Sequence, residues 1–259
     1  MNLTLQPPAL SHADVAAFRR DGFVIARGLF PRARCERLRA LAQAHLDRRV
    51  APVEYEADVR YPGAPESRDA AGGRTVRRLL QACARDGLLR DVALSPEIGA
   101  RLRVLLGPRP LLAQAHHNCV MTKHARFSSR TGWHQDIRYW AFARPDLVSV
   151  WLALGPERVD NGCLQLVPGS HAMEFTRGRF DDALFFRPDL PENRAVLANC
   201  IHAELEPGDT LFFHSRLLHA AGCNRTAETK FSAVFTYHAE DNRPLPGTRS
   251  ATLESLELR

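Results

Sequence analysis

The chain has 259 residues, of which 45% are hydrophobic and 25% are charged, a composition typical of a globular protein with a sizeable core. Its formal net charge is +6, which by itself is compatible with a nucleic-acid partner. The arginines are scattered, however, and no basic run or basic-aromatic repeat extends the short pairs such as Arg19-Arg20. The distribution therefore disfavours nucleic-acid binding. Only two of the 35 basic residues are lysines, Lys123 and Lys230.

Membrane and secretory segments are not evident in the sequence. No stretch approaches the roughly 20 apolar residues of a membrane span, and the N-terminus lacks a basic segment followed by an apolar one, as a secretory leader requires. The six cysteines are spread singly, with no CxxC pair, which favours reduced, mostly buried thiols over structural zinc. We therefore expect a cytoplasmic protein without a membrane partner.

The first hundred residues are predicted to be mainly helical. Residues 10–50 indicate helix, strand and helix: Ser11 and Asp14 resemble a capping pair, and Gly22 ends the first helix. Residues 51–73 are rich in Pro, Gly and charge and predict a long loop, either ordered over a ligand or disordered. Residues 75–107 return to helices, the last of which is capped by Ser95 and ends at Gly107.

Short strand-like runs separated by turns follow Pro110, with no helix predicted between them. They are expected at 111–123, 133–140, 147–154, 163–167, 201–205, 209–214 and 230–238. About seven consecutive strands predict an antiparallel sandwich or jelly-roll barrel. Helices first and strands later indicate an α+β chain in which a helical layer packs on a β core.

One candidate metal site lies in the β region. His134 and Asp136 occupy positions i and i+2, which on a strand project from the same face. His219 lies at the far end of the apolar strand that follows Asp209. One strand that supplies a His and a carboxylate, together with a His from another, would form the facial 2-His-1-carboxylate site that binds Fe(II) and leaves positions open.

Five ordered motifs identify a family. The motifs are FRRDGFVIARGLF, WHQD, VSVWLAL, NGCLQLVPGSH and PGDTLFFHSRLLHAAGCN. Together they resemble the phytanoyl-CoA dioxygenase (PhyH) family of Fe(II)/2-oxoglutarate-dependent oxygenases, and the resemblance runs from about Leu10 to Glu240. The resemblance implies a double-stranded β-helix (a jelly roll, cupin-like) flanked by N-terminal and intervening helices. We expect a single domain over 1–259, with the helical layer at about 10–107 and the β core at about 110–240.

The same resemblance implies a ligand set and a reaction. His134, Asp136 and His219 would ligate iron, whereas His171 would belong to a turn and His214 to a strand. The reaction would be oxidative decarboxylation of 2-oxoglutarate to succinate, coupled to hydroxylation of an unactivated C–H bond in a small-molecule substrate. Because related halogenases lack a carboxylate ligand at this point, Asp136 disfavours halogenation.

The cosubstrate positions depart from the family pattern. The family binds the distal (C5) carboxylate of 2-oxoglutarate with an Arg eleven positions after the distal His, assisted by a hydroxyl two positions after it. Here these positions hold Lys230 and Ala221, so the charge is retained but the bidentate fork and one hydrogen bond are lost. Lys230 then either binds the carboxylate as a point charge, aided by Thr210 or Ser232, or the pocket prefers another oxoacid or none.

Four further residues are candidates for the cosubstrate site. Arg225 is a competing cation, but it lies in a turn, whereas Lys230 shares one strand face with Ser232. Lys123 is either a surface cation or a contact to 2-oxoglutarate or an anionic substrate. The resemblance places Gln135 near the cosubstrate, although an ideal strand would turn it away from the metal. Trp151 either walls the pocket or packs in the core.

Substrate contacts are the least determined part of the site. The candidate lining residues mix polar and aromatic types, which suits a small polar metabolite at least as well as an acyl-CoA; they are His116, His117, Asn118, Arg138, Tyr139, Trp140, Phe185, Phe186 and Arg187. The alternative function is a catalytically drifted jelly-roll protein that binds a metal or ligand. The sequence does not fix the oligomeric state.

Overall fold

The computed structural model describes residues 9–59 and 61–258. The first eight residues, part of the segment in which no leader is predicted, lie outside this range. The predicted helix, strand and helix at the N-terminus are confirmed as α1 (His12–Asp21), β1 (Phe23–Ala26) and α2 (Arg32–Asp47). Ser11 and Asp14 form the expected capping box, and Gly22, with φ of 84°, ends α1 in the left-handed region.

The region from 51 to 107 contains two strands that the sequence analysis missed. The predicted loop includes β2 (Val53–Tyr55) and a 3-10 turn, η1 (Glu56–Asp58). The predicted helical region begins with a strand, β3 (Val76–Leu80), which pairs with β2 and β5. Three helices follow, α3 (Ala82–Arg85), α4 (Gly87–Ala93) and α5 (Pro96–Leu106). The strand pattern of β3 was hidden because Arg77 is a buried cation, paired with Glu56.

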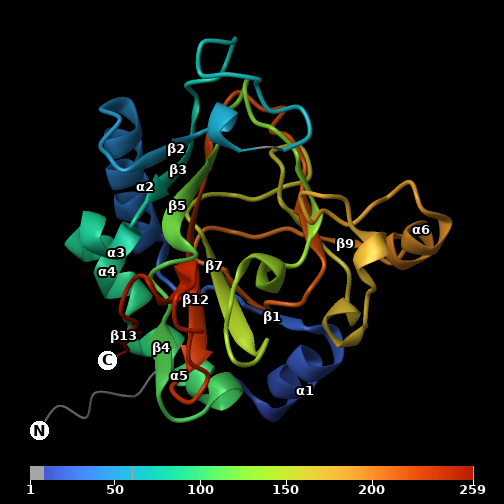
Figure 1. The fold of residues 1–259 in the computed structure, drawn as a ribbon. Helices are drawn as coiled ribbons and strands as arrows, with labels where there is room; N and C mark the ends of the chain where they lie inside the picture. The colour runs from blue at the N-terminus through green and yellow to red at the C-terminus, as the bar shows by residue number, and fades with distance from the viewer. Residues whose placement is uncertain (1–8, 60, 259) are drawn as a thin grey trace, which may run out of the picture.

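The major sheet has nine antiparallel strands. Its continuous order is β1-β10-β7-β12-β5-β3-β2, and β4 pairs with β12 and β13. Besides β1, β2 and β3, this sheet contains β4 (Pro110–Leu112), β5 (Asn118–Lys123), β7 (Leu147–Ala153), β10 (Thr210–His214), β12 (Lys230–Ala239) and β13 (Leu256–Glu257). Helices α2 to α4 lie along the outer side of this sheet, at the left of Figure 1.

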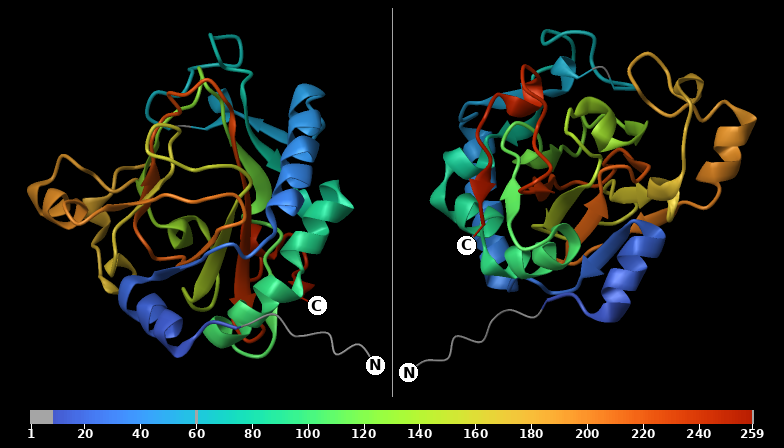
Figure 2. Two further views of the ribbon diagram at one scale, coloured as in Figure 1. Left: turned by 180° about the vertical axis from the view of Figure 1, so that it is seen from behind. Right: turned by 60° about the horizontal axis from the view of Figure 1, so that its bottom comes forward.

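A smaller sheet faces the major one. It has the order β6-β11-β8-β9 and is built from β6 (Thr131–His134), β8 (Leu164–Leu166), β9 (Ile201–Ala203) and β11 (His219–Ala221). The two sheets enclose an apolar layer that includes Trp151, Phe213 and Val234 from the major sheet and Leu164 and Leu166 from the minor one. The views in Figure 2 show the two sheets and the helices flanking them. The predicted α+β jelly roll is confirmed.

The outward side of the major sheet carries the larger core. Phe231, Phe235 and Tyr237 of β12 pack there against helical residues such as Leu38 and Ile98. These aromatic residues alternate along β12 with Lys230, Ser232 and Val234, as the sequence predicts. The alternation places Lys230 on the side of the sheet that faces the minor sheet.

Four predictions in the β region are wrong. The expected strand 111–123 is divided into the two strands β4 and β5. The expected strand 133–140 ends at His134, and a 3-10 turn, η2 (Asp136–Tyr139), takes its place. His219 does not end the strand after Asp209 but begins β11 in the other sheet. A helix, α6 (Pro191–Leu197), interrupts the strand region between β8 and β9 and projects to the right in Figure 1. The remaining short turns are η3 (Ser170–Ala172), η4 (Arg177–Arg179) and η5 (Arg249–Ala251).

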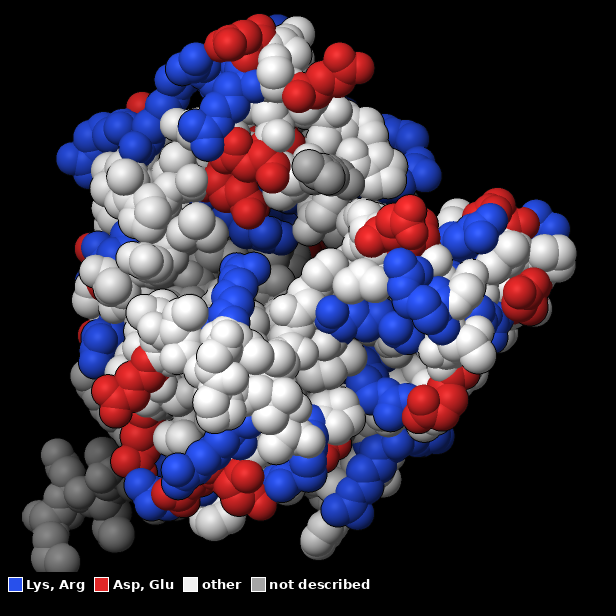
Figure 3. Space-filling view, viewed as in Figure 1, with Lys and Arg blue, Asp and Glu red and all other residues white. Residues whose placement is uncertain are grey.

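One face of the molecule is of mixed charge. On the face shown in Figure 3, basic and acidic side chains lie near one another around a largely uncharged central area. The six cysteines are all free, four of them buried, as the sequence predicts. Among the described residues, no helix combines the length and the apolar character needed to cross a membrane.

Candidate metal centre and adjoining cavities

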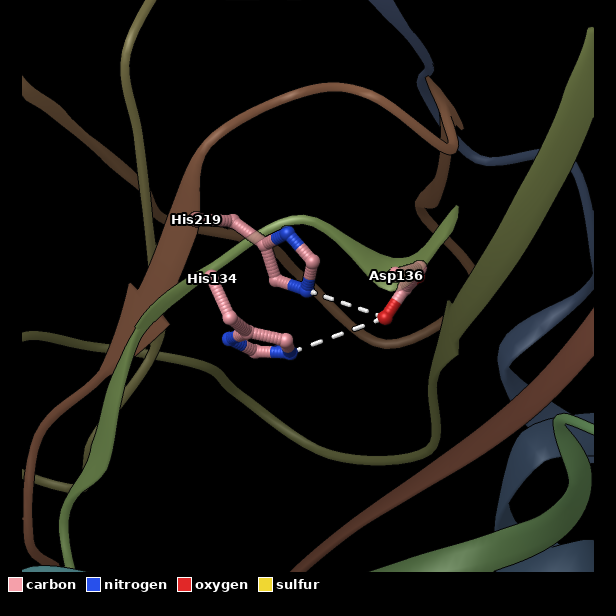
Figure 4. Close-up of side chains that lie close together, drawn as sticks. All are labelled: His134, Asp136 and His219. Atoms are coloured by element: carbon pink, nitrogen blue, oxygen red, sulfur yellow. Dashed lines mark ion pairs between the residues drawn. The ribbon is translucent and has the colours of Figure 1, made fainter. Parts of the chain in front are cut away.

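The structure brings His134, Asp136 and His219 together. His134 ends β6 and pairs across the minor sheet with His219, the first residue of β11. Asp136 begins the turn η2 and directs its Oδ1 atom at both imidazoles (Figure 4), at 3.6 Å from each Nε2 atom. One potential ligand atom from each residue lies within 4.8 Å of the others. The turn therefore achieves the convergence that the sequence analysis assigned to one strand face.

Backbone carbonyls orient both imidazoles. The Nδ1 atom of His134 lies 2.9 Å from the carbonyl oxygen of Gly132, and that of His219 lies 3.0 Å from the carbonyl oxygen of Leu217. Since a carbonyl only accepts, each Nδ1 must carry the proton and donate it. The Nε2 atoms are thereby left to face the shared centre, the arrangement usual for metal-bound histidines.

The Asp136 carboxylate is held from three sides. Its Oδ2 atom accepts a hydrogen bond from Ser149 Oγ at 3.0 Å, and its Oδ1 atom lies 3.2 Å from His117 Nε2. Burial alone would raise the pKa of Asp136, but His117 and the two imidazoles of the centre hold it well below its usual range. Burial, followed by His134, lowers the pKa of His219 to about 4. A carboxylate and a His219 imidazole that is neutral at pH 7 are in the protonation states that metal binding requires. Two imidazole nitrogens and one carboxylate oxygen form a donor set that fits Fe(II).

Replacing Ser149 by alanine should weaken iron binding by about 10- to 100-fold, the usual cost of removing a hydrogen bond to a metal ligand. Thr236 provides the matched control, because it pairs with Ser149 across β7 and β12 and its buried hydroxyl has no hydrogen-bond partner within residues 9–59 and 61–258. Thr236→Val should leave iron affinity unchanged. Anaerobic Fe(II) titration measures both variants, and equal affinities would contradict a supporting role for Ser149.

Two cavities meet at this centre. The inner one, of about 40 Å³, lies between the two sheets and reaches His219, Trp151, Lys123 and Lys230. The outer one, of about 330 Å³, reaches Asp136. Both are lined by Tyr61, Arg78, His117 and His134. The outer space is within the size range of small-molecule sites, whereas the inner one is far narrower.

The inner cavity contains three of the five predicted cosubstrate residues. Lys230 is buried, and its Nζ atom lies 2.8 Å from Glu157 Oε2 and 3.4 Å from Ser232 Oγ. Trp151 lines the cavity and also donates from Nε1 to Glu157 Oε1 at 2.7 Å. Lys123, predicted as either a surface or a binding cation, is buried in the cavity wall.

Gln135 and Arg225 lie elsewhere. Gln135 is buried, donates to the carbonyl of Arg216 and accepts from Arg138, so both ends of its amide are hydrogen-bonded, and it lines neither cavity. Arg225 is exposed beside a separate groove on the surface of the minor sheet. The structure therefore separates both residues from the inner cavity.

The outer cavity gathers part of the predicted substrate set. His117, Tyr139 and Trp140 line it, together with His116 and Phe185. Arg138 instead lies over the ring of Phe180, with 3.5 Å between its guanidinium carbon and the ring centroid. The other predicted residues also point elsewhere: Asn118 accepts from the Cys83 backbone, Phe186 packs in a separate apolar cluster, and Arg187 pairs with Asp189.

Sequence reasoning missed three side chains that shape the centre. Ser149 lies within the apolar run of β7, and its polarity there was a usable signal. Arg77 was assigned to a helix, and Glu157 follows a turn with no local pattern. Arg77 meets Glu56, and Glu157 meets Lys230, through contacts between distant parts of the sequence.

Comparison with known proteins places the chain in a family. The sequence model of the phytanoyl-CoA dioxygenase (PhyH) family matches residues 18–232. A probable phytanoyl-CoA dioxygenase of Caenorhabditis elegans is 26% identical over 93% of this chain and 79% of its own length. The peroxisomal phytanoyl-CoA dioxygenase of Homo sapiens is 27% identical over 86% of this chain and 67% of its own.

Solved structures share the fold. EctD from S. alaskensis with bound Fe superposes with a TM-score of 0.77 at 20% identity, over 96% of this chain and 87% of that one. The epimerase SnoN, solved with Fe3+, alpha ketoglutarate and nogalamycin RO, gives 0.72 at 23% identity, over 96% and 95%. The family match covers most of the sequence and includes all three residues of the centre. The chain therefore belongs to the phytanoyl-CoA dioxygenase family, and it is an oxygenase that depends on iron and 2-oxoglutarate.

Proposed function

We propose that this oxygenase hydroxylates an unactivated C–H bond of a small molecule and converts 2-oxoglutarate to succinate. In this reaction 2-oxoglutarate loses CO₂, one atom of O₂ enters succinate, and the other enters the substrate C–H bond. The observation that carries the proposal is the position of the His134, Asp136 and His219 centre at the junction of two cavities. One cavity can hold the oxoacid while the other presents a C–H bond to the same point.

The three residues of the centre would hold the iron. Fe(II) supplies O₂ activation when it is bound. The chain would supply two Nε2 donors and one carboxylate oxygen, a set of ligands that leaves other positions open for small ligands. Ser149 and the carbonyls of Gly132 and Leu217 fix these donors before any ligand arrives.

The inner cavity would hold the oxoacid. Its ketone end would lie near His134 and His219, and its distal carboxylate near the two lysines, with Trp151 as a wall. Lys230 stands eleven positions after His219, where the family resemblance places the cosubstrate's cation. Both lysines are buried, and buried surroundings strengthen the attraction between a carboxylate and ammonium groups.

The outer cavity would hold the substrate. Aromatic walls from Tyr139, Trp140 and Phe185 alternate with the polar groups of His116 and His117, a combination that orients a small, partly polar molecule. The names of similar structures include an epimerase and a carbocyclase, and EctD was solved with 5-hydroxyectoine. These names support a small-molecule substrate, and the reaction outcome has to be measured on the product.

The test measures where the two oxygen atoms of O₂ are incorporated. Iron-loaded protein is given 2-oxoglutarate and ¹⁸O₂, first alone and then with a panel of small amino acids, hydroxy acids and polycyclic alcohols. We expect succinate that contains one ¹⁸O atom, and from a productive panel member a product with one added oxygen. Absence of succinate would contradict the oxygenase reaction. Loss of two hydrogens, or a stereochemical change without added oxygen, would contradict hydroxylation.

A further inference from the structure

The basic side chains that line the inner cavity are not all paired with carboxylates. Four basic residues line it: Arg77, Arg78, Lys123 and Lys230. Three of them are paired with carboxylates: Arg77 with Glu56 at 3.2 Å, Arg78 with Glu54 at 2.7 Å, and Lys230 with Glu157 at 2.8 Å. Within the described part of the chain, Lys123 has no carboxylate in ion-pair contact. The uncompensated positive charge of this cavity is therefore at Lys123.

Glu157 is held as a fixed anion beside Lys230. Its side chain is fully buried, and its Oε1 atom accepts from Trp151 Nε1 and from Ser232 Oγ at 2.6 Å, while Oε2 accepts from Lys230. The backbone of Glu157 exchanges two hydrogen bonds with Leu205, which anchors the residue. A second carboxylate approaching Lys230 therefore meets an ammonium group whose charge is already offset.

Lys123 lies directly across the sheet from Lys230. The two residues are paired in the register of β5 and β12, so their side chains project from the same face of the sheet. The Nζ atom of Lys123 donates to the carbonyl of Ser129 at 3.2 Å, its single hydrogen bond to the residues that the structure describes. A buried ammonium group without an anion is costly, and an anionic ligand in the cavity would remove that cost.

We infer that the distal carboxylate of the oxoacid binds between Lys123 and Lys230, and that Glu157 makes Lys123 the residue that decides the preference for dicarboxylic oxoacids. This inference rests on the proposed function, because it assigns an end of the same cosubstrate cavity. It also accounts for the departure from the family pattern: two lysines and one fixed glutamate replace one arginine and one hydroxyl. Lys123 and Glu157 are thus specificity-determining residues for the cosubstrate.

A pH dependence of oxoacid binding is expected from the role of Lys123. Burial, followed by Arg77 and Lys230, lowers the pKa of Lys123 to about 7. The groups facing it are Arg77 from β3, Lys230 from β12, Glu56 from η1 and Cys223 after β11. Because the ammonium form binds the carboxylate, binding above this pKa takes up a proton, and affinity should fall as pH rises from 7 to about 9.

The experiment compares two oxoacids by anaerobic calorimetry on the iron-loaded protein. One is 2-oxoglutarate, and the other is 2-oxopentanoate, which has a methyl group in place of the distal carboxylate. The wild-type protein should prefer 2-oxoglutarate. Lys123→Met should reduce that preference by about 10- to 100-fold, the value of a charge-assisted hydrogen bond, and abolish its pH dependence. Lys123→Arg should retain most of the preference, and iron affinity should be unchanged in both variants.

Glu157→Gln is the second variant to be tested in the same comparison of the two oxoacids. It removes the anion that offsets Lys230, so the preference for 2-oxoglutarate should rise. If this variant does not fold, Glu157→Gln combined with Lys230→Met removes the pair as a unit, and Lys123 alone should still maintain a preference. An unchanged preference in Lys123→Met would overturn the inference while leaving the proposed function intact. If the wild-type protein bound neither oxoacid, the proposed function itself would fail.

Discussion

Replacing His134 by alanine is expected to lower the affinity for Fe(II) by more than about 100-fold, because loss of a ligand must cost more than loss of a supporting hydrogen bond. The variant retains Asp136 and His219 but leaves only two protein donors, and Asp136 loses one of the imidazoles it faces. Succinate formation should fall to background at iron concentrations that saturate the wild-type protein. Equilibrium dialysis of Fe(II) under nitrogen, followed by a succinate assay in air, measures both effects.

His202→Ala is the matched control for this variant. His202 also lies in the minor sheet, in β9, but it is exposed. Its removal should change neither iron affinity nor succinate formation. If His134→Ala bound iron as tightly as His202→Ala, the three-residue centre would not be the metal site.

The buried pair of Arg77 and Glu56 should dominate the local stability. Arg77 is 6% exposed and Glu56 1%, and the guanidinium also donates to Ser129 Oγ at 2.9 Å and to Thr131 Oγ1 at 2.7 Å. Arg77→Met would leave the Glu56 carboxylate buried without its cation. We expect the free energy of unfolding to fall by about 3–5 kcal/mol, the usual cost of breaking a buried pair from one side.

The control is an exposed ion pair. Arg32 and Glu36 lie one helical turn apart in α2, and their side chains are 78% and 63% exposed, so Arg32→Met should cost less than about 0.5 kcal/mol. Arg77→Met combined with Glu56→Leu should cost less than Arg77→Met alone, because no charge is then left unpaired. Urea denaturation measures all three. Equal midpoints for Arg77→Met and Arg32→Met would refute the structural role of the buried pair.

Local sequence signals account for what could be predicted. The capping box at Ser11, the helix that starts at Pro96 and the wholly apolar β7 depend on neighbours in sequence, and the structure confirms each element. His134 and Asp136 are two positions apart, so any extended or turning backbone keeps them close. The predicted strand through Asp136 was wrong, but the proximity of these two side chains did not depend on it.

Long-range contacts account for what was missed. Strand β3 contains Arg77 and Arg78, whose charges are offset by Glu56 and Glu54 from a segment predicted as loop. No local pattern reveals that such a strand is buried. Lys230 and Glu157 are separated by 73 positions, so the sequence could place Lys230 near the cosubstrate only by resemblance and could not show that its charge is offset.

Anaerobic titration of Fe(II) and 2-oxoglutarate tests the central claim most directly, because it requires the metal centre and the oxoacid cavity to act at one point. Adding 2-oxoglutarate to the iron-loaded protein should produce the visible metal-to-cosubstrate band, and adding O₂ should bleach it with release of succinate. His134→Ala and His219→Ala should show no band. Absence of the band in the wild-type protein, or an undiminished band in either variant, would contradict the account.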